Sequence, residues 1–500
     1  MKLVKSLLLG STAVLTAAAG AQAADLPSRK AAPVEYVRIC DAYGAGFFYI
    51  PGTDTCLRVG GYVRAEYDFT PAQRIINAGS SYSVGSSTVA TGGISQVGAD
   101  QTTTGMELRG RVDLDARTQT SWGTVQSVVN LRGTNADGLR NSGSIANFST
   151  IYAPGSNASS SLTMERAYIR FAGVTAGVGT ENFSTMPAYL YSGGIYPGFP
   201  NGIKQLAYTA TFGGGFSATL AVESAGDLGY NTSSGSLVGP SSVATAISTT
   251  YNNTWDSGDI LVGVVRDDQS WGFAQINGAI GNDTVTAYNG TYYSTANNAL
   301  LGAASYGSYA IGMSFRYNLN MIAPGDQFNF QVQYARGLDG LLLSSGGLSN
   351  LSDSSNQRFL GGLERKDSNL VPTMVNASGQ ITAYGLETGW SIEGLFTHYW
   401  TPTWRSNFLL GYVEINPPTA NSYNGGQNAG LNTQWGQGDA FAAAANIIWS
   451  PAKNFDIGLE AEYLHLTSKL QNPSTAFVSA GLPGLTEDGF NTHLRLERTF

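Results

Sequence analysis

Short runs of alternating apolar and polar residues recur along the chain from residue 57 to its last residue. The run at 57–69, LRVGGYVRAEYDF, sets apolar side chains against polar or charged ones, and the runs at 107–119, 328–336 and 455–465 do the same. Successive side chains of a β-strand point to opposite faces, so each run predicts a strand with one apolar and one polar face. The repetition of this pattern predicts an all-β protein.

The alternating runs number about sixteen. Tight turns and long Ser/Thr/Gly/Asn-rich loops separate them in alternation, and an even number of strands with this loop asymmetry is typical of bacterial outer-membrane barrels. We therefore predict a transmembrane antiparallel β-barrel over residues 58–500. Its strands are expected near residues 58–69, 105–119, 124–132, 162–172, 173–179, 204–212, 215–223, 258–267, 271–280, 306–318, 326–337, 384–400, 403–415, 437–450, 454–468 and 489–500.

Alternation alone does not distinguish a barrel from a soluble sandwich, because the apolar face of a strand meets lipid in the first and the protein core in the second. The placement of tryptophan favours the barrel, since membrane proteins concentrate this residue at the water interface. Five tryptophans lie in or beside the predicted tight turns: Trp122, Trp271, Trp400, Trp404 and Trp449. Turn aromatics that pack on a sandwich core remain the alternative explanation.

The composition agrees with many strands joined by loops of small residues. Charged residues make up 12% of the chain, about half of the usual ~25%. Glycine accounts for 63 of the 500 residues, well above the usual ~7%. The formal net charge is −8, which disfavours a nucleic-acid partner because such a partner needs a basic surface.

Residues 1–23 have the features of a secretory signal peptide. Lys2 and Lys5 precede an apolar stretch at 7–19, and Ala21-Gln22-Ala23 forms a small-x-small cleavage site. After this segment no run reaches the roughly 18 apolar residues of a membrane helix. The chain is therefore expected to be exported, either as a soluble protein or as a barrel.

Residues 24–57 are expected to form an N-terminal periplasmic tether. This segment holds both cysteines of the chain, Cys40 and Cys56. In an exported protein two cysteines this close together favour a disulfide. Two free thiols remain an alternative, and a metal site is disfavoured because no further His or Cys lies nearby.

Catalytic and cofactor motifs are missing from the sequence. It contains no G-x-S-x-G, no H-E-x-x-H and no P-loop. The three histidines, His398, His465 and His493, each lie on or at the end of a predicted strand, and we expect each to be an interfacial or surface residue. We predict no enzymatic activity, no cofactor and no metal.

Several segments resemble one family of proteins. The block ADLPSRKAAPVEYVRICDAYGAGFFYIPGTDTCLRVGGYVRAEYDF at 24–69, the pair RAYIRFAGVTAGVG at 166–179 and the last strand ending in Phe500 are similar to the alphaproteobacterial porins of the rhizobial type. The resemblance extends over essentially the whole chain from residue 24, and the first of these blocks is the most specific.

The resemblance implies a porin in the bacterial outer membrane that lets small hydrophilic solutes and ions diffuse passively. It implies a homotrimer of sixteen-stranded barrels, surrounded by outer-membrane lipid, with an inward-folded constriction loop at about 180–204. It also implies that Phe500 is the signal that the barrel assembly machinery recognises.

Charged residues on the polar face are the candidates for the pore constriction. Strand parity places a series of arginines there with carboxylates between them, and fixed charges in a narrow passage bias which ions enter. Cross-strand bracing by opposite charges is the alternative role. The residues expected at mid-barrel height are Arg64, Arg111, Arg132 and Arg166, followed by Arg109, Arg170, Asp113 and Glu181.

Two other functions stay open from the sequence. One is a substrate-specific outer-membrane channel, and the other is an exported β-rich adhesin or binding protein that uses its long loops. The ion preference is also open, because the arginines favour anions and the net charge of −8 favours cations.

Overall fold

The computed structural model separates the chain into two units, one ending at Leu57 and the other running from Arg58 to Phe500. The predicted signal peptide and most of the tether lie outside the described residues. None of the helices in the described part of the chain is long and apolar enough to cross a membrane. The structure describes residues 38–70, 75–78, 94–97, 103–138, 159–191, 202–224, 247–248, 252–253, 259–291, 299–342, 370–375, 381–416, 437–469 and 484–500.

The smaller unit is organised around a disulfide between Cys40 and Cys56, which confirms the predicted bridge. The 3-10 helix η2 (Asp41–Tyr43) and the strand β1 (Phe47–Tyr49) lie inside the loop that it closes. Phe47 is buried with the two cysteines, and Tyr43 and Tyr49 pack against this cluster. The unit has too few residues for a large core, so the bridge supplies part of its stability.

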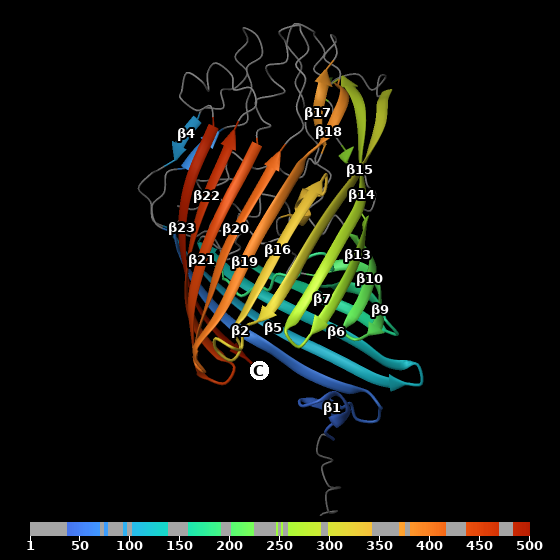
Figure 1. Ribbon diagram of the computed structural model, residues 1–500, viewed down its shortest axis with the longest axis vertical. Coiled ribbons are helices and arrows are strands. Elements are labelled where there is room, and N and C mark those ends of the chain that lie inside the picture. The colour runs from blue at the N-terminus through green and yellow to red at the C-terminus, as the bar shows by residue number, and fades with distance from the viewer. Residues whose placement is uncertain are drawn as a thin grey trace, which may run out of the picture. The chain divides into compact units, whose positions relative to one another are not determined.

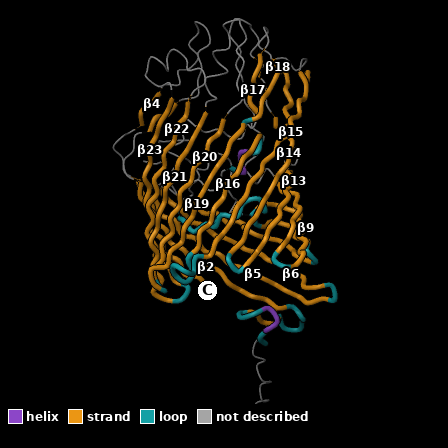
Figure 2. The backbone as a smooth tube through the Cα atoms, in the orientation of Figure 1, coloured by secondary structure: helices purple, strands orange, loops and turns teal. Residues whose placement is uncertain are grey.

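The larger unit is a closed barrel of sixteen antiparallel strands, as predicted (Figures 1 and 2). Each barrel strand pairs with the next barrel strand along the chain, and the last pairs with the first, so that none of the described barrel strands is an edge strand. The barrel strands are β2 (Cys56–Thr70), β5 (Thr103–Thr120), β6 (Gly123–Gly138), β7 (Ser159–Phe171), β8 (Val174–Gly179), β9 (Ile203–Gly213), β10 (Phe216–Ser224), β13 (Asp259–Gln269), β14 (Gly272–Thr291), β15 (Ala299–Asn318), β16 (Gln327–Arg336), β19 (Thr388–Thr401), β20 (Trp404–Asn416), β21 (Gln437–Ala452), β22 (Phe455–Lys469) and β23 (Gly484–Thr499).

Short elements extend the barrel at its loops. Two of them, β11 (Ile247–Ser248) and β12 (Asn252–Asn253), pair with β14. Two hairpins stand apart from the main sheet, formed by β3 (Ile75–Ala78) with β4 (Ile94–Val97) and by β17 (Leu370–Val375) with β18 (Ile381–Leu386). A 3-10 helix, η4 (Asp339–Leu341), follows β16.

Two strand boundaries differ from the prediction. The expected loop at 281–305 is mostly strand, because β14 and β15 pair from Gly272 with Tyr317 to Asn289 with Ala299. Small and polar residues fill this stretch, so its alternation is too weak to predict a strand. The expected strand at 384–400 is instead divided at Glu387 between β18 and β19.

The barrel is apolar outside and polar inside on several strands, the reverse of a soluble sandwich. Val63 and Leu162 are 61% and 77% exposed, whereas Glu66 and Glu460 are 2% and 1% exposed. All five tryptophans of the predicted interfacial belt are exposed, and Trp404 stacks on Trp449 with ring centroids 5.8 Å apart. This arrangement suits lipid around the barrel and water within it.

The barrel closes where β23 meets β2. The two strands pair in antiparallel register, from Tyr62 opposite Thr499 to Phe69 opposite Thr492. Beyond the last ladder residue, the Phe500 amide donates to the Gly61 carbonyl at 3.0 Å, and the Gly61 amide donates to the Phe500 carbonyl at 3.2 Å. A Cβ at Gly61 would lie 2.0 Å from the Arg111 carbonyl oxygen and 3.0 Å from the Phe500 ring. The Arg111 carbonyl of β5 and the Phe500 ring both lie so close to β2 at this position that only glycine fits.

Replacing Gly61 with alanine is expected to weaken barrel closure. The new methyl group must push the Arg111 carbonyl away, and strain of this kind costs about 1–3 kcal/mol. The urea midpoint of the refolded barrel, followed by tryptophan fluorescence, should fall. Gly110→Ala is the matched control, because a Cβ there meets no atom within 4 Å. Equal midpoints for the two variants would contradict the assigned role of Gly61.

Candidate channel constriction

The loop after β8 folds into the barrel, as predicted, and side chains of the wall hold its first residues. Asn182 donates to Glu223 on β10 twice, through its backbone amide at 2.9 Å and its side-chain amide at 2.6 Å. The Gln275 side chain on β14 donates to the Asn182 carbonyl at 3.3 Å. The described part of this constriction loop is residues 180–191 together with Gly202.

The middle of the constriction loop is held on β16. Ser184 Oγ and the Thr185 amide both donate to Gln331 Oε1, at 3.0 and 3.1 Å. Between these contacts and the first anchor, Phe183 is 1% exposed and belongs to the apolar cluster of the inner wall. Polar contacts therefore fix the loop backbone while an aromatic side chain anchors it.

The end of the described loop reaches the strands near the seam. Asn446 on β21 donates to the Tyr189 carbonyl at 3.0 Å, and the Tyr191 amide donates to Glu460 on β22 at 2.7 Å. The Arg495 guanidinium of β23 lies 3.9 Å from the centre of the Tyr191 ring. Burial raises the pKa of the Tyr191 phenol, so this side chain stays neutral. The loop thus contacts the wall from β10 to β23 across the barrel interior.

One glycine makes room for the loop tip. A Cβ at Gly458 on β22 would lie 1.8 Å from the Tyr191 hydroxyl oxygen and 2.7 Å from the ring carbon that carries it. The ring therefore occupies space that any other residue at 458 would fill.

A second segment packs on the same inner wall. Leu338, Leu341 and Leu342, in and beside η4, are at most 3% exposed and belong to the apolar cluster that includes Phe183 and Leu190 of the constriction loop. Small side chains of β21, namely Ala440, Ala442 and Ala444, are part of this cluster. The expected polar inner face is therefore wrong for this part of the wall, which is apolar and covered by loop residues.

The opposite part of the wall carries the charged side chains. Arg111 contacts Asp113 at 2.8 Å and Glu165 at 3.4 Å, and Arg132 pairs with the same Glu165. Arg109 Nη2 donates to Glu107 at 3.0 Å. Each of these arginines is thus balanced by a carboxylate on its own or a neighbouring strand.

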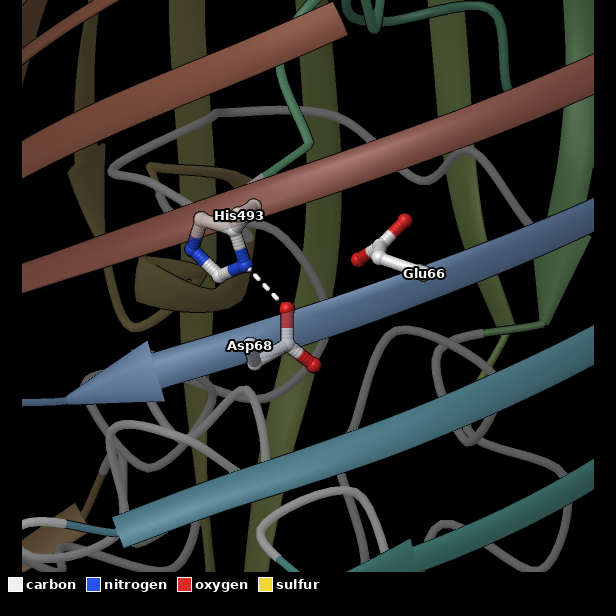
Figure 3. Close-up of side chains that lie close together, drawn as sticks. All are labelled: Glu66, Asp68 and His493. Carbon is white, nitrogen blue, oxygen red and sulfur yellow. Dashed lines mark hydrogen bonds and ion pairs between the residues drawn. The ribbon is translucent and has the colours of Figure 1, made fainter. Parts of the chain in front are cut away.

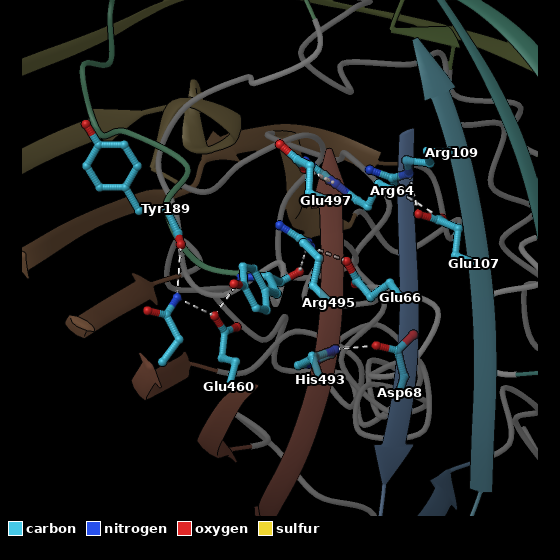
Figure 4. A network of polar contacts seen from close by, with 12 residues as sticks. Arg64, Glu66, Asp68, Glu107, Arg109, Tyr189, Glu460, His493, Arg495 and Glu497 are labelled. Atoms are coloured by element: carbon cyan, nitrogen blue, oxygen red, sulfur yellow. Dashed lines mark hydrogen bonds and ion pairs between the residues drawn. The ribbon is translucent and has the colours of Figure 1, made fainter. Parts of the chain in front are cut away.

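The ion pairs continue across the seam (Figure 4). Arg64 on β2 pairs with Glu497 on β23 at 2.6 Å, and Arg495 on β23 pairs with Glu66 on β2 at 2.5 Å. These pairs join the first and last barrel strands, so they brace the closure as well as line the interior.

A possible metal cluster lies within this network. Glu66, Asp68 and His493 are buried and place ligand atoms within 4.8 Å of one another (Figure 3). His493 Nδ1 already shares a hydrogen bond of 2.5 Å with Asp68 Oδ1, and Glu66 accepts from Arg495. An ion would have to displace both contacts, so the geometry favours an ion-pair network over a metal centre.

A family model described as "Porin subfamily" matches residues 25–483. The chain belongs to this porin family. Its relatives include Porin Omp2b of Brucella suis biovar 1 and of Brucella melitensis biotype 1, each 37% identical over 233 residues. These matches cover 45% of this chain and 55% of the relative, so the chain spans about half the length of the curated relatives it matches.

A solved structure supports the fold. The outer membrane channel DcaP of Acinetobacter baumannii matches with a TM-score of 0.54 at 15% identity, over 90% of this chain and 99% of that one. Membership of the porin family places the chain in the outer membrane, and the family is one of channels rather than of enzymes.

The structure brings most of the predicted constriction residues of this porin onto one part of the wall. Arg64, Arg109, Arg111, Asp113 and Arg132 take part in the ion pairs above. On β7, Arg166 lies opposite Asn130 and Arg170 lies opposite Gln126, both without an ion pair among the described residues. Glu181 is 6% exposed in the constriction loop.

The sequence prediction missed Glu165. A β-bulge shifts the register of β6 and β7, so that Arg166 faces Asn130 while Met164 faces Leu131, and Glu165 is the extra residue. Strict alternation from Arg166 places Glu165 on the lipid side, where a carboxylate is unfavourable. That conflict was the available signal for a bulge at this position.

Proposed function

We propose that this porin forms a water-filled channel through which small hydrophilic solutes and ions diffuse passively. The observation that carries the proposal is the closed barrel with a loop fastened across its interior from Glu223 on β10 to Arg495 on β23. A loop held by several hydrogen bonds leaves a fixed passage rather than a movable plug. The passage then runs beside the charged part of the wall.

We assign the electric field of the passage to the charged side chains predicted from the sequence. Arginine stays ionised at any physiological pH, so this field does not titrate away. Because most arginines here are paired with carboxylates, the net field is weaker than their number suggests. The assigned residues are Arg64, Arg109, Arg111, Asp113, Arg132, Arg166 and Arg170, with Glu181 at the base of the constriction loop.

The remaining assignments rest on the family and the sequence. The channel acts as a homotrimer surrounded by outer-membrane lipid, and it performs no catalysis and uses no cofactor. Residues 1–23 direct export, residues 24–57 form a periplasmic segment, and Phe500 is read by the barrel assembly machinery. The paired hydrogen bonds between Phe500 and Gly61 are consistent with a final residue that fixes the closure.

Single-channel recording of the refolded mature chain in a planar bilayer tests the proposal. Ohmic steps that close in threes at high voltage are the expected result, together with entry of small sugars into liposomes. A correctly folded sample without conductance would overturn the channel and favour an exported binding protein. Conductance in single steps would overturn the trimer alone.

A further inference from the structure

The inward arginines of the neighbouring strands β2, β5, β6 and β7 fall into two groups. On β2, β5 and β6 every inward arginine of the described residues has a carboxylate partner. Arg111 shares Glu165 with Arg132, and Arg117 contacts Asp115 at 2.7 Å. Arg58 reaches the same Asp115 at 3.6 Å. Carboxylates on the same strand or on a nearby one offset the charge of these arginines, so they attract a dissolved anion only weakly.

The two arginines of β7 differ. Across the ladder they face the neutral amides of Asn130 and Gln126, and within the described part of the barrel neither forms an ion pair. Arg170 is exposed, and among the described residues its Nε donates to the hydroxyl of Thr175, at 3.3 Å. Arg166 is half-buried. Among the described residues of β2, β5, β6 and β7, uncompensated positive charge is thus concentrated on β7.

An aromatic side chain lies between these two cations. Arg166, Tyr168 and Arg170 share one face of β7, because they are two residues apart after the bulge. The Arg170 guanidinium lies 5.4 Å from the centre of the Tyr168 ring. Arg166 and Arg170 are about 13 Å apart along the strand, a distance that their long side chains can reduce. The strand therefore presents a track of cation, aromatic ring and cation to the lumen.

We infer that this track is a binding site for small organic carboxylates on their way through the channel. A guanidinium matches a carboxylate with two parallel hydrogen bonds. The Tyr168 ring offers an apolar surface to the carbon part of the solute. Hydrogen bonds with an ionised partner are worth enough to change affinity by about tenfold each. The inference rests on the proposed channel function and adds a solute class to it.

Block of single-channel current by benzoate tests the site. The unaltered channel should show saturable block, and R166Q/R170Q should need about tenfold more benzoate, because the single carboxylate of benzoate pairs with one guanidinium at a time. R117Q is the matched control, since it also removes one inward arginine, but one that is paired with Asp115. R117Q is expected to keep the block.

A second variant separates a binding site from a general field. R166K/R170K keeps both charges but loses the planar fork, so its reversal potential in a KCl gradient should be unchanged while benzoate block weakens. The R166K/R170K variant also tests the binding site if R166Q/R170Q does not fold. Conductance without benzoate block, or equal loss of block in R117Q, would overturn the site and leave the channel intact. Absence of any conductance would instead overturn the proposed channel function, and the site with it.

Discussion

Replacing Glu165 with glutamine is expected to lower the stability of the barrel by about 2 kcal/mol. Removing one partner of a buried ion pair typically costs ~3–5 kcal/mol, because the remaining charge is left uncompensated. Arg111 and Arg132 are directly opposite each other on β5 and β6, and both contact Glu165. Like charges in this position repel, so the shared carboxylate stabilises two cations at once.

Two features make the expected loss of stability smaller than is typical for a buried ion pair. The Arg111 and Arg132 side chains keep 28% and 16% exposure, so water screens part of the repulsion. Arg111 also keeps its contact with Asp113.

A second effect should accompany the loss of stability, because the Glu165→Gln variant removes one negative charge from the inner wall. The reversal potential in a KCl gradient should move toward anions.

Equilibrium unfolding in urea measures the first effect, and a planar bilayer measures the second. Asp268→Asn is the matched control, since it also breaks an arginine pair, with Arg266, but its carboxylate is 55% exposed. An exposed pair is worth at most about 1 kcal/mol. If both variants unfold at the same urea concentration, the two arginines do not depend on Glu165.

The barrel is largely predictable from the sequence because its side-chain period is two. All sixteen expected strands correspond to barrel strands, and the parity of Arg64, Arg111 and Asp113 agrees with their inward contacts. The period breaks at the bulge in β7, and strict alternation carried through it places Glu165 on the lipid side. Glu165 was therefore missed although its neighbour Arg166 was placed on the correct face.

Contacts of the constriction loop could not be predicted in the same way. The Tyr191 amide and Glu460 are 269 positions apart in the sequence, and Ser184 and Gln331 are 147 apart. No local pattern relates such residues, since their meeting depends on how the barrel closes. The apolar lining was missed for a similar reason, because Leu338, Leu341 and Leu342 follow the end of a strand and have no alternating partner.

Replacing Gly458 with alanine is expected to lower single-channel conductance. Tyr191 occupies the space beside this glycine, and a methyl group there would lie 1.8 Å from the tyrosine oxygen. The wall strand β22 is paired on both sides with β21 and β23, so the loop must yield rather than the strand. The ring then moves off the wall and into the passage, which becomes narrower.

Displacement of the Tyr191 ring also breaks its contact with the Arg495 guanidinium. Arg495 lies 3.9 Å from the centre of the Tyr191 ring and donates to the Tyr191 carbonyl at 3.4 Å. Losing the ring contact removes about 1–2 kcal/mol from the attachment of the loop tip. The hydrogen bond from the Tyr191 amide to Glu460 is strained by the same movement. Fluctuations of the open-channel current should therefore increase as the mean current falls.

Gly263→Ala is the control for a glycine-to-alanine change in a barrel strand, because a Cβ at that position meets no atom within 4 Å. The double variant G458A/Y191A gives a stricter comparison, since it keeps the methyl group and removes the ring. Its conductance should return at least to the level of the unaltered channel. A G458A channel with unchanged conductance would show that the Tyr191 ring is not held against β22, and a G458A/Y191A channel as narrow as G458A would show that the methyl group acts on another part of the wall.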